Sequence, residues 1–97
     1  MENNITSQQN ISLISAIEAI LFAYGEPMTI NKISKLLNIG KEDIEKELKN
    51  LKNELEKENR GLRLIFNDNK VQMTTKPEFS HLLEEFIKEE FKEILTP

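Results

Sequence analysis

Residues 17–37 read IEAILFAYGEPMTINKISKLL, and this stretch predicts two helices separated by a sharp corner. Apolar residues before the corner recur at the spacing of a helix, at Leu13, Ile17, Ile20 and Tyr24. Gly25 can adopt the left-handed conformation that closes a helix, and Pro27 prevents its continuation. We therefore expect a first helix from about Ile11 that ends at Tyr24 or Gly25.

The corner itself predicts a short strand and the cap of the second helix. Met28-Thr29-Ile30 is β-prone, and the side-chain oxygen of either Thr29 or Asn31 can cap a helix that follows. The second helix then carries an apolar face made of Ile33, Leu36 and Leu37. A tight helix–corner–helix unit is the expected result.

A third helix, a hairpin and a last helix follow in the pattern. The third helix is expected from Lys41 to about Glu58, with Gly40 at its cap and a narrow buried face of Ile44, Leu48, Leu51 and Leu55. The β-prone runs 62–66 and 71–75 are joined by residues 67–70, whose short polar side chains tolerate the positive φ of a hairpin turn. Pro77 suits the start of the last helix, which has a wide apolar stripe.

Together these elements predict an α+β fold, a winged helix-turn-helix with a small antiparallel sheet and an extra carboxy-terminal helix. The hairpin is the wing, and residues 28–30 supply the third, short strand. A length of 97 residues suits one domain with one modest core. We therefore expect a flexible polar tail over residues 1–10 and a single winged-helix domain over residues 11–97.

Residues 19–30, AILFAYGEPMTI, resemble the amino-terminal domain of the ScpB family of segregation and condensation proteins. Residues 44–55, 60–64 and 71–79 share the resemblance, which runs from about Ser12 to Leu95. Members of that family usually have a second winged-helix domain, which would begin just after this chain stops. The resemblance thus implies that the second domain is absent and that residues 95–97 form a domain boundary of a truncated chain.

The resemblance also implies a function. ScpB proteins are non-enzymatic adaptors of the SMC–kleisin (condensin-like) complex, which takes part in chromosome condensation and segregation. Members are expected to form a homodimer through this domain and to bind the kleisin ScpA, and through it the SMC ATPase, which performs the ATP hydrolysis. The implied location is the cytoplasm, in association with the nucleoid through the SMC complex.

Composition narrows the chemistry that the chain can perform. It contains one histidine, no cysteine and no glycine-rich phosphate loop, so an enzyme is disfavoured and no cofactor or metal is expected. His81 and Glu85 are four residues apart, but two ligands do not close a metal site. Residues 67–69 partly resemble a calcium-binding loop but lack its glycine and distal glutamate.

The longest apolar run, residues 19–24, is too short to span a membrane.

The distribution of charge bears on the alternative function, that of a winged-helix DNA-binding transcription regulator. The chain has a net charge of −4, and its only positive concentration lies in the wing, where Arg60, Arg63, Lys70 and Lys76 are possible phosphate contacts. The third helix, which would enter the major groove, begins with acidic residues such as Glu42 and Asp43. Direct DNA binding is therefore disfavoured, although the basic wing leaves it open.

A protein interface explains more of the pattern, because both terminal helices are apolar over more surface than one small core consumes. The candidate residues for a dimer interface lie on a second apolar face of each helix, beside the face expected to pack in the core. They are Ile11, Ile14, Leu21, Phe86 and Phe91. The alternative is that the two helices pack against each other, since a fully buried helix is also apolar all round.

Overall fold

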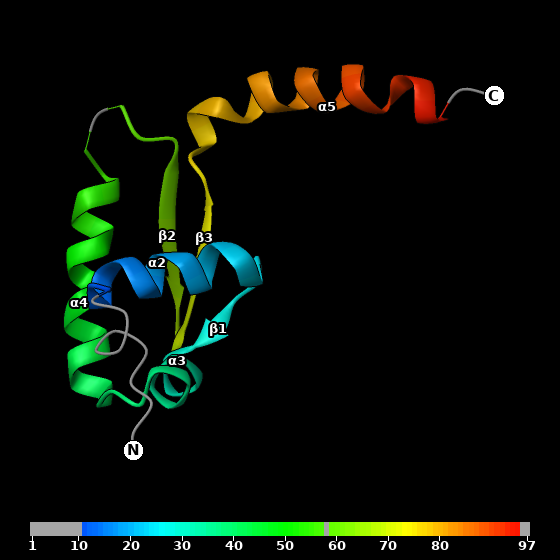
Figure 1. Ribbon diagram of the computed structural model, residues 1–97. Coiled ribbons are helices and arrows are strands. Elements are labelled where there is room, and N and C mark those ends of the chain that lie inside the picture. The colour runs from blue at the N-terminus through cyan, green and yellow to red at the C-terminus, as the bar shows by residue number, and fades with distance from the viewer. Residues whose placement is uncertain (1–10, 58, 96–97) are drawn as a thin grey trace.

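The computed structural model describes residues 11–57 and 59–95, with side chains described as far as Glu90. The tail expected over residues 1–10 lies outside the described residues, and the proposed single domain over 11–97 stays a prediction. The elements in chain order are α2 (Leu13–Tyr24), β1 (Met28–Thr29), α3 (Ile30–Leu37), α4 (Lys41–Leu55), β2 (Leu62–Asn67), β3 (Lys70–Thr75), the 3-10 helix η1 (Pro77–Phe79) and α5 (Ser80–Leu95). Figure 1 labels the α-helices and the strands.

Helix α2 has a cap at each end. The extended residue Ser12 accepts a hydrogen bond at its Oγ from the backbone N–H of Ser15 at 3.2 Å, so the helix begins at Leu13, two residues later than expected. At the other end Gly25 has φ 75°, and its N–H donates to the carbonyl of Leu21 at 3.1 Å. The predicted end of this helix is confirmed.

Thr29 connects the sheet to helix α3. Its backbone is extended, as β1 requires, and its Oγ1 accepts a hydrogen bond from the N–H of Lys32 at 3.1 Å. Of the two predicted caps, Thr29 is therefore the one used. The apolar face of α3 consists of Ile30, Ile33 and Leu37, which are buried.

The prediction that Leu36 shares this face is wrong, because 52% of Leu36 is exposed whereas Leu37 is 1% exposed. Helix α3 begins at Ile30, and from there the positions three and seven residues on, Ile33 and Leu37, return to the buried side. Leu36 precedes Leu37 by one residue and therefore points about 100° away from it around the helix.

Helix α4 follows the prediction at its start and on its buried face. It begins after Gly40, with Glu42 and Asp43 in its first turn. Acidic side chains there stabilise the helix, because they interact favourably with the positive end of its dipole. All four predicted core positions are buried, and they share one side of the helix: Ile44, Leu48, Leu51 and Leu55. The helix ends at Leu55 rather than near Glu58, and Glu56 is its cap.

The three strands form one antiparallel sheet in the order β1-β3-β2. Asp68, at φ 58°, provides the positive φ expected in the hairpin turn. The register places Leu64 opposite Met73, and Met28 of β1 opposite Val71. These four side chains are buried together with the apolar faces of α2, α3 and α4, which completes a single core. The winged helix-turn-helix with a third short strand is thus confirmed.

Helix α5 leaves this core. The hairpin closes with a hydrogen bond from the N–H of Lys76 to the carbonyl of Gly61 at 2.8 Å, after which Pro77 begins η1. From there α5 extends away from the other elements, as Figure 1 shows. No α5 side chain between Ser80 and Glu90 is buried. The extra carboxy-terminal helix therefore exists, but over its described part it adds nothing to the core.

The two adjacent leucines of α3 provide a matched test of the core. We expect Leu37→Ala to lower the free energy of unfolding by about 2–5 kcal/mol, because it opens a cavity among buried side chains. Leu36→Ala is expected to change it by less than about 0.5 kcal/mol, since this side chain is largely in solvent. Urea unfolding followed by circular dichroism measures both. Equal losses for the two variants would contradict the assignment of the buried face.

Candidate interaction surfaces

The described side chains offer surfaces for binding rather than a constellation of reactive groups. Among residues 11–57 and 59–90, no group of three or more histidine or acidic residues is arranged to hold a metal ion. His81 lies exposed on α5, and residues 67–70 form the hairpin turn and the strand ends beside it. No described helix is both long and apolar enough to cross a membrane.

The first candidate surface is the α5 stripe, which we define as Leu82, Leu83, Phe86 and Ile87. Leu82 is 63% exposed, Phe86 is 57% exposed and Ile87 is 50% exposed. The spacing of three and four residues places these side chains along one side of the helix. Leu83 is half-buried. An amphipathic helix gains most of its stability by packing such a side against another element, and the described elements leave Leu82, Phe86 and Ile87 largely uncovered.

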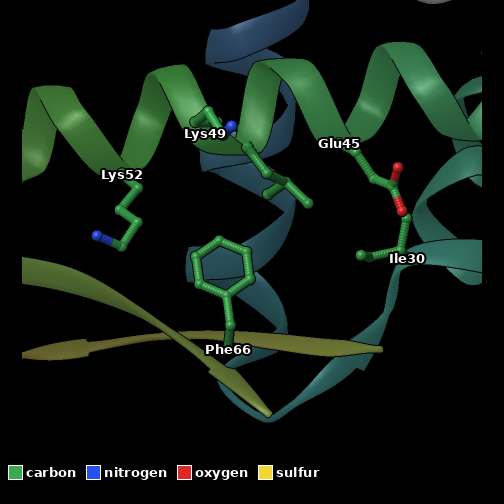
Figure 2. Close-up of a pocket in the computed structure, with 6 residues that line it drawn as sticks. Ile30, Glu45, Lys49, Lys52 and Phe66 are labelled. Atoms are coloured by element: carbon green, nitrogen blue, oxygen red, sulfur yellow. The ribbon is translucent and has the colours of Figure 1, made fainter. Parts of the chain in front are cut away.

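The second candidate surface is the α4–hairpin groove, lined by Ile30, Glu45, Leu48, Lys49, Lys52 and Phe66. Figure 2 shows Phe66 rising from β2 with its ring towards α4, below Lys49 and Lys52. The groove has a volume of about 310 Å³. Its apolar floor is bordered by charged side chains that belong to α4, and Lys52 forms an ion pair with Glu56 at 2.5 Å.

Sequence reasoning missed this groove, although the strand alternation contains a signal for it. Phe66 pairs with the buried Val71, so its side chain is on the helix-facing side of the sheet, as is that of Leu64. Phe66 is nevertheless 40% exposed because it lies towards the hairpin tip, where α4 covers it incompletely. An aromatic residue on the core face of a strand, next to the turn, was the available clue.

The outward side of α2 is the third apolar surface, and the prediction also missed it. Phe22 is 71% exposed, more than any other large hydrophobic side chain in the described part of the chain. Tyr24, on the same helix, lies beneath the ammonium group of Lys32 at 4.8 Å from the ring centroid. The cation–π contact leaves Tyr24 45% exposed.

The structure separates the five predicted interface residues. Leu21 is 0% exposed and belongs to the same buried cluster as residues of α4 and the sheet, so its assignment to an interface is wrong. Ile11 and Ile14 are partly buried against the core, and Phe86 is exposed. The side chain of Phe91 lies outside the described ones. The exposed α5 stripe also shows that α2 and α5 do not bury each other's apolar faces.

The four basic residues of the wing region do not form one cluster. Arg60 lies 3.8 Å from Glu18 of α2, while Lys76 Nζ donates to the carbonyl of Lys57 at 3.2 Å. Arg63 shares a shallow hollow with Lys76 near the open end of the hairpin, whereas Lys70 lies beside the turn at its other end. Their role as phosphate contacts stays a prediction, and their separation gives it no geometric support.

Comparison with known proteins agrees with the fold. Residues 15–97 match the family model described as Segregation and condensation complex subunit ScpB. A segregation and condensation protein B from Clostridium botulinum (strain Kyoto / Type A2) is 32% identical over 96 residues, which cover 99% of this chain and 49% of the relative. One from Carboxydothermus hydrogenoformans is 36% identical over 78 residues, which cover 80% of this chain and 42% of the relative. The chain spans less than half the length of these two curated relatives.

Two solved structures share the fold. A crystal structure of a dimer of the ScpB N-terminal domain complexed with a ScpA peptide superposes with a TM-score of 0.71 at 23% identity, covering 75% of this chain and 91% of that one. The crystal structure of ScpB from Mycobacterium tuberculosis superposes with a TM-score of 0.74 at 19% identity, covering 79% of this chain and 48% of that one.

The unsupported position of α5 predicts an uneven pattern of amide hydrogen exchange. In dilute protein, we expect amides of residues 82–90 to exchange almost as fast as a fraying helix end. Amides of α4 around Leu48 and Leu51 should exchange only through global unfolding, because both side chains are in the core. Exchange followed by mass spectrometry measures the two segments together, and equal protection of α5 at every dilution would contradict its solvent-exposed placement.

Proposed function

The chain belongs to the ScpB family of segregation and condensation complex subunits, and on that basis we propose that it is a non-enzymatic adaptor of an SMC–kleisin complex. In this role it forms a homodimer, binds the kleisin ScpA and takes part in chromosome condensation and segregation. The observation that carries the proposal is the family match over residues 15–97, which includes every described element from α3 to α5. The structural neighbour described as a dimer complexed with a ScpA peptide supports both kinds of contact.

The surfaces of the molecule fit an adaptor. Exposed apolar side chains occur on α5, on α2 and in the α4–hairpin groove, so several elements present surface that protein partners can cover. The function then consists of binding alone: the dimer holds two kleisin-binding surfaces at a fixed separation, while the SMC ATPase performs the hydrolysis. Its place in the cell follows from its partners, in the cytoplasm and on the nucleoid.

The electrostatics of α4 support binding to protein rather than to duplex DNA. In a helix-turn-helix protein that reads DNA, the leading end of this helix approaches the phosphate backbone. Here Glu42 and Asp43 occupy the first turn, and both are exposed. Their charge repels phosphate where attraction is required.

Light scattering and titration calorimetry with ScpA from the same genome test the proposal. We expect the chain to be dimeric at micromolar concentration and to bind ScpA saturably, whereas a DNA duplex should bind weakly, with an affinity that disappears as salt is raised. Leu36→Ala, an exposed and isolated substitution, serves as a control that should alter neither dimer nor complex. If the chain is monomeric, does not bind ScpA and binds duplex DNA saturably, the proposal is wrong and a DNA-binding transcription regulator is favoured.

A further inference from the structure

We infer that the homodimer forms by reciprocal exchange of α5, with the α5 stripe of each copy docked in the α4–hairpin groove of the other. This inference rests on the dimer of the proposed function and specifies its contact. The groove and the stripe are both apolar, and each lacks a partner within the described part of its own chain. A second copy supplies each surface with the other.

The apolar linings of the two surfaces suit each other. The groove lies beside α4, and its apolar lining comes from Ile30 of α3, Leu48 of α4 and Phe66 of β2. An amphipathic helix lays its apolar side into such a groove with side chains at three- and four-residue spacing. Leu82, Phe86 and Ile87 have that spacing and lie on the helix that leaves the body. Burial would also stabilise α5, which as an isolated helix of 16 residues is only marginally stable.

The charges of the two surfaces are complementary. Lys49 and Lys52 border the groove on its α4 side, and Lys49 belongs to none of the ion pairs among the described residues. On α5, Glu85 and Glu89 form a row one turn apart beside Leu82 and Phe86. Docking the stripe therefore brings an acidic row towards a pair of lysines, while Glu45 lies at the other end of the groove beside Ile30.

The same charges argue against the simplest alternative, in which two α5 helices pair with each other. Between Ser80 and Glu90 the helix has four glutamates and one lysine, so two copies placed side by side repel. Exchange into the groove avoids this repulsion. The reciprocal docking also gives a closed two-fold dimer, because each copy provides one stripe and one groove and all four surfaces are then occupied.

Engineered cysteines test the contact directly, because the chain has no cysteine of its own. We would mix a Lys49→Cys variant with a Glu85→Cys or a Glu89→Cys variant, so that a mixed disulfide can form only between copies, and identify the product by mass. Asn50→Cys is the matched control, since it is exposed on α4 next to Lys49 but does not line the groove. We expect the Lys49→Cys mixture to give about tenfold more mixed dimer than the control mixture.

Substitution of the apolar contact provides a second measurement. Phe86→Glu and Phe66→Glu should each raise the dimer dissociation constant about tenfold or more, as loss of a central apolar contact does in other interfaces. Circular dichroism confirms that each variant is folded. Phe86 is exposed and does not belong to the core, so Phe86→Glu should fold. The test therefore remains valid even if Phe66→Glu does not fold.

The possible failures are distinguishable. If the wild type is dimeric and binds ScpA, but the cysteine mixtures match the control and Phe86→Glu leaves the dimer intact, the exchange is wrong and the proposed function stands. If Phe66→Glu abolishes ScpA binding and leaves the dimer unchanged, the groove belongs to the kleisin and the exchange is again wrong. A wild type that neither dimerises nor binds ScpA overturns both proposals.

Discussion

The corner between α2 and α3 is the constraint on which the arrangement of the other elements depends. Gly25 ends α2 in a left-handed conformation, and four residues later Thr29 caps α3, so the chain turns within a very short distance. Met28, between these two positions, pairs with Val71, and the N–H of Ile30, directly after Thr29, donates to the carbonyl of Asn69 at 2.9 Å. The corner therefore attaches both helices to the hairpin, although the hairpin lies about forty residues further along the chain.

The core around this corner is small, and apolar surface is left uncovered outside it. The buried side chains come from α2, α3, α4 and the sheet, and none comes from the described part of α5. None of the exposed large hydrophobic side chains among the described residues belongs to this core. Their apolar character is thus better explained by contact with other proteins than by folding, which agrees with the proposed adaptor function.

Much of the fold could be predicted from the sequence, and the errors have one physical origin. The end of α2, the start of α3 and the turn of the hairpin depend on Gly25, on the capping oxygen of Thr29 and on Asp68, all of which act on neighbouring residues. The errors at Leu36 and Leu21 concern which apolar side chains are covered. Periodicity indicates that a helix has an apolar side. It does not show which side chains on that side are most buried, because their burial depends on the elements that pack against the helix.

The sequence by itself determined the types, order and approximate limits of the helices and strands, the family resemblance and the presence of more apolar surface than one core requires. Only the tertiary structure decided where that surface lies. It placed Leu21 inside, left Phe22 outside, directed α5 away from the body and opened a groove beside Phe66. The reason is that local conformation follows from interactions within a few residues, whereas exposure depends on how elements distant in the chain pack together.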